Sequence, residues 1–349
     1  MNNVRYFNRT LGPVIFALIA ISGLYYVKWA PYTSRAFVAA AHHSIGSSIL
    51  MGAAAAPPAP SLDAALGYAL AYGKAIWQAL VLGLLLGSGV QALLPANAVT
   101  KLLGRTSFGS ALTGGLLGVP TMMCTCCAAP VVAGLRERRA SSGAAIAFWL
   151  GNTVLNPATL IFMGFVLGWN WTALRLGLGV LMVFGLGYLI NRMATPVEAM
   201  AARAEFAGLG TLERDGVFLR WLSILARMTL RLIPEYVVLV LLLGAARAWL
   251  FPHVGPEIDN HLGWIVALAV AGMIFVIPTA GEVPIIQAML SLGMGVGPAG
   301  ALLMTLAPVS APSLAMLLRS FAPQRLALVA AAVVAFGIAG GLLAVWLRF

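Results

Sequence analysis

Apolar residues run through this chain in long, continuous stretches rather than in alternating patterns. Seven of these stretches are near the length of about 20 residues that a helix needs to cross a hydrocarbon core of roughly 30 Å. They cover residues 13–29, 75–94, 144–166, 172–191, 233–250, 299–318 and 326–346. Continuous runs indicate membrane-spanning α-helices and not barrel strands, whose apolar residues alternate. The pattern therefore predicts an all-α polytopic membrane protein.

Two further apolar regions, 106–135 and 264–293, are interrupted near their middle. Pro120, Thr121 and three cysteines interrupt the first region, and the stretch from Pro278 to Glu282 interrupts the second. Each arm is then roughly 12–14 residues, or about 18–21 Å of helix, which is long enough to enter a bilayer but not to cross it. We therefore expect two re-entrant hairpins, each made of two short helices.

The proline and glycine positions around the first hairpin recur around the second. The corresponding residues, 154 or 155 positions apart, are Pro130 with Pro284, Gly143 with Gly297 and Pro157 with Pro312. The first hairpin is expected to enter from the cytoplasm and the second from outside. The two halves are then an inverted-topology repeat, an arrangement that many secondary transporters use. A chance match of short proline and glycine patterns is the alternative explanation.

Charged residues are rare and mark the orientation of the chain. The chain is 61% hydrophobic and 9% charged, with a mean hydropathy of +0.95, which excludes a water-soluble fold. The net charge is +11, but the basic residues lie at the ends of apolar runs and form no patch suited to nucleic acid. Six arginines lie between Arg192 and Arg231, whereas the loops near Asn170 and at 252–261 contain no Lys or Arg. This asymmetry predicts an inner-membrane protein with a cytoplasmic N-terminus and a periplasmic C-terminus.

These features divide the chain into four predicted parts. Residues 1–62 form an N-terminal transmembrane helix, retained and not cleaved as a signal peptide, and an external linker. Residues 63–192 form the first transmembrane repeat with the cysteine-containing hairpin. Residues 193–232 form a cytoplasmic linker and a helix at the membrane surface, and residues 233–349 form the second repeat with the Glu282 hairpin.

The three cysteines of the chain, Cys124, Cys126 and Cys127, lie at the break of the first hairpin. They precede a short helix, whose N-terminus favours the thiolate form. Thiolates are soft ligands, so the cluster is a candidate substrate site and a transient ligand set for a soft metal ion. A buried cysteine is also simply a small hydrophobe, and the spacing of Cys124 and Cys127 is that of thiol oxidoreductases.

Other polar residues at membrane depth are further candidates. Glu282 lies at the break of the second hairpin, and an ionisable group there is a candidate for proton coupling unless it stays hydrated near the outer surface. Asn152 and Asn156 are four residues apart on one helix face. Together with Thr121 and Ser310 they are candidate substrate-binding residues. The alternative is that they satisfy backbone groups freed at the neighbouring prolines.

The pattern resembles the predicted-permease family that includes the organoarsenical efflux permeases. The resemblance is carried by the segments 124–130, 136–139 and 281–284 and covers roughly residues 70–346, which leaves residues up to about Pro60 outside it. It implies export of a soft, thiol-reactive species such as a trivalent organoarsenical, with the cysteines as transient ligands. Family members commonly have Cys-Ser-Cys-Gly where this chain has Cys-Thr-Cys-Cys, so the resemblance does not fix the substrate.

We therefore expect a secondary-active permease with no cofactor and no enzymatic activity, because the sequence contains no nucleotide-binding motif. Its expected partners are a small-molecule or ion substrate and the lipid bilayer, with no nucleic acid. A homo-oligomer or a role as one subunit of a permease complex is compatible with the sequence. Two rival functions stay open: uptake of a sulfur oxyanion such as thiosulfate, and a membrane thiol oxidoreductase that uses Cys124 and Cys127.

Overall fold

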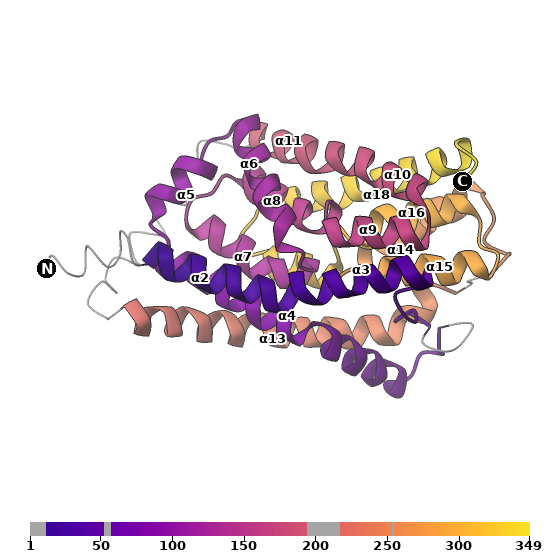
Figure 1. Cartoon of the computed structure of the whole chain (residues 1–349), viewed down its shortest axis with the longest axis horizontal. Coiled ribbons are helices and arrows are strands. Elements are labelled where there is room, and N and C mark those ends of the chain that lie inside the picture. The colour runs from indigo at the N-terminus through magenta and orange to yellow at the C-terminus, as the bar shows by residue number, and fades with distance from the viewer. Residues whose placement is uncertain (1–11, 52–56, 194–216, 253–254) are drawn as a thin grey trace, which may run out of the picture.

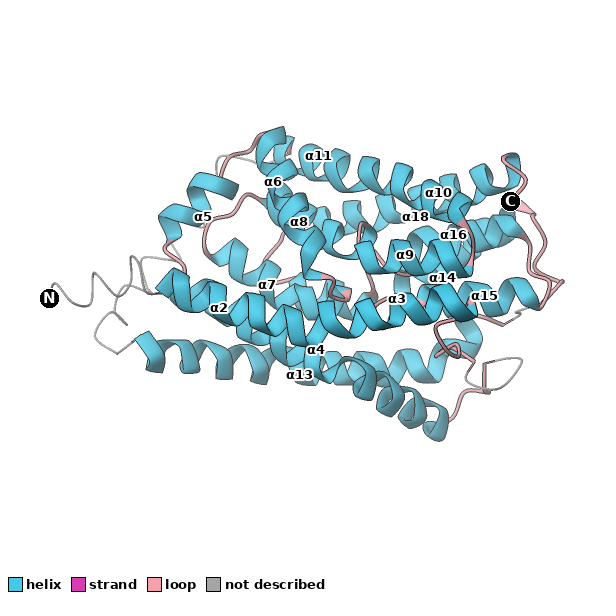
Figure 2. Ribbon diagram, viewed as in Figure 1, coloured by secondary structure: helices cyan, strands magenta, loops and turns pink. Residues whose placement is uncertain are grey.

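The computed structural model describes residues 12–51, 57–193, 217–252 and 255–349, and all regular structure in these ranges is helical (Figure 1, Figure 2). Within them, six helical stretches are long and apolar enough to cross a bilayer. They are Gly12–His42, Leu62–Leu93, Ser142–Val166, Trp169–Arg192, Val217–Leu250 and Pro323–Trp346. The prediction of an all-α polytopic membrane protein is confirmed.

The helices of the first half extend from the N-terminal helix to residue 192. In chain order they are α2 (Gly12–Leu24), η2 (Tyr25–Trp29), α3 (Ala30–His42), α4 (Leu62–Leu93), α5 (Ala96–Leu103), α6 (Phe108–Gly118), η3 (Val119–Thr121), α7 (Thr125–Glu137), α8 (Ser142–Val154), α9 (Pro157–Val166), α10 (Trp169–Val180), η4 (Leu181–Gly185) and α11 (Leu186–Arg192). The helices of the second half are α13 (Val217–Leu250), α14 (Leu262–Ile274), α15 (Glu282–Ser291), α16 (Val296–Thr305), α17 (Ala311–Leu317) and α18 (Pro323–Trp346).

Several helical stretches differ from those that the apolar pattern predicts. The first helix continues to His42, the second begins already at Leu62, and the predicted span 144–166 is interrupted between α8 and α9. The surface helix predicted within 193–232 is part of α13, which runs unbroken through its internal proline. A proline removes one backbone hydrogen bond, which need not end a helix. The predicted span 299–318 is interrupted between α16 and α17, because Pro308 and Pro312 disfavour helix in the residues that precede them.

Some predictions concern residues outside those that the structure describes. Most of the predicted cytoplasmic linker falls in 194–216, and the N-terminus itself falls in 1–11. The division into four parts and the orientation of both termini stay predictions.

Two segments contain a break between short α-helices, as the sequence indicates; the first break includes the 3₁₀ turn η3. Residues 119–124, here called the first tip, join α6 to α7, and residues 275–281, the second tip, join α14 to α15. The two segments come from opposite ends of the bundle, and their tips meet in its interior (Figure 1). Each tip holds one non-glycine residue in the left-handed conformation, Met122 with φ of 50° and Ala280 with φ of 64°. Such residues cost roughly 1–3 kcal/mol and cluster at functional sites. The re-entrant entry and the inverted repeat stay predictions, since no bilayer is part of the structure.

Glycines allow α7 to lie directly against α4. A Cβ at Gly83 would meet the backbone oxygen of Cys127 at 2.0 Å, and one at Gly87 would meet that of Pro130 at 2.4 Å. Small residues permit this close approach of helix backbones in membranes, where van der Waals packing holds helices together. The position of the cysteine-bearing helix therefore depends on these two glycines.

We expect Gly83→Ala to destabilise the protein and Gly73→Ala, on the same helix, to leave it unchanged. The first Cβ collides with backbone that cannot move aside, whereas nothing lies within 4 Å of the second. Overpacking of this kind costs about 1–3 kcal/mol. Thermal unfolding of the detergent-solubilised variants measures the difference, and equal melting temperatures for the two would contradict the predicted packing.

Candidate functional site

The three cysteines converge on one point at the start of α7. Cys124 is the residue that precedes the helix, and Cys126 and Cys127 lie in its first turn. Their sulfur atoms all lie within 4.8 Å of one another, with 3.2 Å between those of Cys124 and Cys126. All three side chains are buried. Three thiols at this spacing suit a soft ion or an arsenic atom and not Mg²⁺ or Ca²⁺, which require oxygen ligands.

Buried tyrosines form the wall behind the sulfur cluster. The Tyr236 hydroxyl donates to the Cys126 sulfur at 3.1 Å, and the Tyr72 hydroxyl lies 3.0 Å from the same atom. Tyr68 stacks on Tyr72, and its hydroxyl donates to the carbonyl of Val276 in the second tip. None of these tyrosines is among the residues predicted from the sequence, although two tyrosines four apart in one apolar helix are a signal that indicates a shared buried face.

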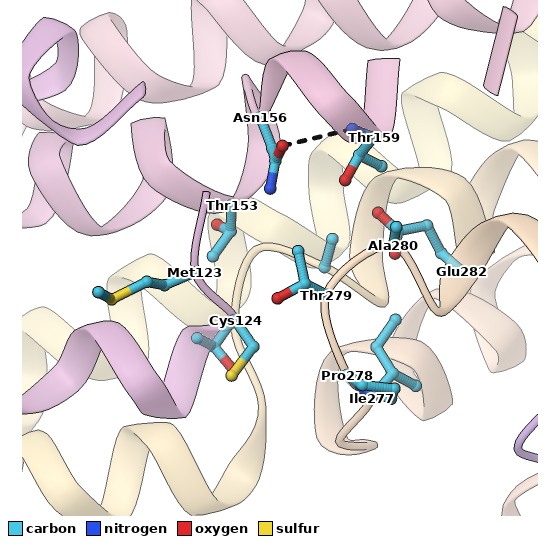
Figure 3. Close-up of a pocket in the computed structure, with 12 residues that line it drawn as sticks. Met123, Cys124, Thr153, Asn156, Thr159, Ile277, Pro278, Thr279, Ala280 and Glu282 are labelled. Carbon is cyan, nitrogen blue, oxygen red and sulfur yellow. Dashed lines mark hydrogen bonds between the residues drawn. The ribbon is translucent and has the colours of Figure 1, made fainter. Parts of the chain in front are cut away.

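A small cavity lies between the two tips (Figure 3). Its volume is about 10 Å³, room for roughly one water molecule and far below the roughly 300–1,000 Å³ of pockets that hold drug-sized ligands. The residues that line it come from both halves of the chain: Met123, Cys124, Thr125, Thr153, Asn156, Thr159, Ile277, Pro278, Thr279, Ala280, Glu282 and Ala307. Of the three thiols only Cys124 reaches the wall, so a ligand meets that sulfur first.

Asn156 lines the cavity and has an unused hydrogen-bond donor. Its side-chain oxygen accepts from the backbone N–H groups of Ala158 and Thr159 at 3.1 and 3.3 Å, which caps α9. Its amide nitrogen is buried without a protein partner and points into the space between Thr153 and Thr279 (Figure 3). Asn156 thus fits both interpretations of its sequence position. Its amide oxygen satisfies backbone groups next to a proline, and its amide nitrogen faces the cavity, where it can bind a substrate.

The other predicted polar residues surround the cavity without lining it. Asn152 binds the first tip: its oxygen accepts from the Met123 N–H at 2.8 Å and from the Thr121 hydroxyl, and its nitrogen donates to the Met123 carbonyl at 3.1 Å. The Ser310 hydroxyl lies 3.2 Å from that of Thr125 and so joins the N-terminus of α17 to that of α7. In the structure these side chains position the tips.

Glu282 is buried and paired with an arginine that the sequence analysis did not single out. One carboxylate oxygen lies 3.0 Å from Nη1 of Arg175, and the other has no hydrogen-bond partner. Both side chains are at most 2% exposed, so the alternative of a hydrated carboxylate near the outer surface does not hold. An arginine inside an apolar span was the available signal for this partner.

Arg175 also connects the broken helices of the two halves. It donates to the carbonyls of Thr153 and Val154 at the end of α8, at 3.0 and 3.1 Å, and to that of Leu303 near the end of α16, at 2.9 Å. Carbonyls at helix ends lack intrahelical donors and carry partial negative charge. The guanidinium therefore links α8, α16 and the start of α15 around the cavity.

The first helix, which the family resemblance does not cover, contacts both tips. Lys28 donates to the Thr279 hydroxyl in the second tip at 3.0 Å, and the Trp29 indole donates to the Pro120 carbonyl in the first tip at 2.8 Å. The helix packs against α4 and α9. The sequence pattern does not single out Lys28, since the first apolar run ends at residue 29 and a lysine is common at the end of a span.

Known proteins resemble this chain over the part that contains both tips. A sequence profile of the family described as "Predicted permease" matches residues 62–345, which contain both tips and every site residue described above except those of the first helix. The chain is 49% identical over 338 residues to UPF0718 protein YraQ of Escherichia coli (strain K12), across 95% of this chain and 94% of that protein. No solved structure matches the chain. The chain therefore belongs to the family of predicted permeases and is a multi-pass membrane transporter.

Proposed function

We propose that this permease of the inner membrane exports a soft, thiol-reactive substrate, such as a trivalent organoarsenical or a soft metal ion. The observation that carries the proposal is the convergence of three buried sulfur atoms within 4.8 Å of one another, with Cys124 at the wall of the cavity between the tips. Transport needs a ligand set that binds and then releases its cargo. A site in which one thiol faces the cavity and two lie behind it allows stepwise exchange.

The chemistry at the cysteines is ligand exchange without any change in oxidation state. A trivalent arsenical with two hydroxyl groups reacts with two thiols, forming two As–S bonds and releasing two water molecules. The reverse reaction with water frees the arsenical on the other side. Cys124 makes the first bond because it lines the cavity, and Cys126, 3.2 Å away, makes the second. The tips must move apart to admit even a small arsenical, because the cavity has room for roughly one water molecule.

We further propose that Glu282 couples transport to protons. Protonation would neutralise the carboxylate and weaken its ion pair with Arg175, which ties the start of α15 to the ends of α8 and α16. The tips are then freer to exchange access between the two sides of the membrane. The unpartnered oxygen of Glu282 supports this role, because it offers a proton acceptor at the cavity.

Uptake of a sulfur oxyanion and a thiol oxidoreductase activity stay the alternative functions. Family membership favours a transporter over an enzyme. An oxidoreductase would have to form a reversible disulfide between Cys124 and Cys127, and it would have no use for the Glu282 site. Direct assay of resistance and uptake separates these possibilities.

Expression in a bacterial host that lacks its own exporters is expected to raise resistance to at least one of methylarsenite, arsenite, antimonite, copper, silver or mercury. Replacing all three cysteines with serine should return resistance to that of the empty host, since serine is a hard oxygen ligand. Cys124→Ser alone should remove most of the effect. Growth inhibition across the panel is the measurement.

Met294→Leu is the matched control, because it removes a buried sulfur away from the tips and conserves volume. Membrane abundance of each variant is measured alongside. If the wild type protects against none of these species, or the triple variant protects as well as the wild type, export through the cysteines is wrong.

Glu282→Gln is expected to abolish substrate accumulation driven by a proton gradient while leaving downhill exchange of substrate intact. Glutamine keeps the size of the side chain and the contact with Arg175, but it has no carboxylate that can take up and release a proton. Transport into membrane vesicles, with and without an imposed pH gradient, measures both modes. Gradient-driven accumulation at the wild-type rate would refute the coupling role.

A further inference from the structure

The first helix presents three neighbouring side chains to the tips. Trp29 donates to the first tip, and Lys28 donates to the hydroxyl of Thr279 in the second. The Tyr32 hydroxyl lies 3.5 Å from the Thr279 carbonyl. These residues lie in or just after the π-helical turn Tyr25–Trp29, and such turns occur frequently at functional sites. The helix thus contacts the substrate site through a specific local distortion.

Lys28 is a buried positive charge with no carboxylate beside it. Its side chain is 3% exposed, and its ammonium contacts the Thr279 hydroxyl and the face of the Tyr32 ring, 5.2 Å from the centroid. The ion pairs of Arg175 with Glu282 and of Arg319 with Glu235 do not involve Lys28. Burial of an ammonium group without an anionic partner is costly, and such residues in membrane proteins mark substrate paths.

The positive charge reaches the cavity through the second tip. Thr279, whose hydroxyl accepts from the ammonium group, lines the same cavity as Cys124. Arg175 and Glu282 neutralise each other, so the site with neutral thiols carries a net charge of about +1 from Lys28. The unpartnered amide nitrogen of Asn156 adds a second donor at the cavity. This environment attracts an anion and repels a bare metal cation.

We propose that Lys28 is a substrate-binding residue of this cavity, supplied by the first helix, and that the substrate is a small anion bearing an exposed soft atom. The inference rests on the proposed role of the cysteines and narrows the class of substrate. The soft atom lies against the thiols, and the anionic oxygens face Lys28, Thr279 and Asn156. The soft atom is either sulfur, as in thiosulfate, or trivalent arsenic that carries an acidic group.

Binding of three probes to the purified protein in lipid nanodiscs distinguishes the effect of a ligand's negative charge from that of its soft atom. Thiosulfate is soft and anionic, sulfate is anionic without a soft sulfur, and methylarsenite is soft and neutral. The wild type should bind thiosulfate more tightly than sulfate. An arsenical that bears a carboxylate, compared with its uncharged analogue, tests the arsenic source in the same way.

Lys28→Met should weaken thiosulfate binding by about tenfold or more, the scale of one lost charge-assisted hydrogen bond, and change methylarsenite binding less than about twofold. Lys28→Arg should retain most of the thiosulfate affinity because it keeps the charge. Lys74→Met, which removes an exposed lysine from α4, should behave as the wild type. If Lys28→Met does not fold, Lys28→Gln replaces it.

The proposal is overturned if the wild type binds thiosulfate no better than sulfate, or if Lys28→Met leaves thiosulfate binding unchanged. It is equally overturned if Lys28→Met weakens methylarsenite binding as much as thiosulfate binding, or if Lys28→Arg loses as much thiosulfate affinity as Lys28→Met. Either result would indicate that Lys28 supports the packing of the site and does not bind the anion by its charge. Failure of the proposed cysteine role is distinguishable, because the triple Cys→Ser variant would then keep wild-type affinity for every probe.

Discussion

Backbone groups freed where a helix breaks inside a membrane protein must be satisfied by the protein, because hydrocarbon supplies neither donor nor acceptor. The buried polar side chains of this permease meet that requirement one by one. Arg175 takes the end carbonyls of α8 and α16, Asn152 pairs with the backbone of Met123, and the Trp149 indole donates to the carbonyl of Thr125 at 3.0 Å. The breaks between the α-helices exist inside the bundle because these side chains complete the hydrogen bonds of the freed backbone groups.

The candidate site contains the buried polar groups that this hydrogen-bond network does not pair. One oxygen of Glu282 and the amide nitrogen of Asn156 have no protein partner, and both residues line the cavity. Next to them, three thiols converge and Lys28 supplies a charge without a carboxylate. Buried groups left unsatisfied are costly, so their gathering at one cavity is best explained by a ligand that completes them.

The first helix belongs to this arrangement although the family profile begins at residue 62. The alignment with the E. coli relative covers 95% of the chain, so it extends into this 31-residue helix. Only 11% of the most apolar part of the helix is buried, yet Lys28 within it is almost fully enclosed. The helix packs against α4 and α9, and its buried lysine reaches the cavity through Thr279 of the second tip.

The sequence by itself determined the membrane class, most of the helices and the two breaks, because the length of apolar runs and the position of prolines act locally. It also identified Cys124, Asn156 and Glu282, whose residue types are unusual at membrane depth. Only the tertiary structure decided that Arg175 pairs with Glu282, that Asn152 clamps a tip and that Lys28 joins the site. These contacts link residues 29 to 251 positions apart, and a local pattern contains no information about which distant polar groups meet once the helices pack.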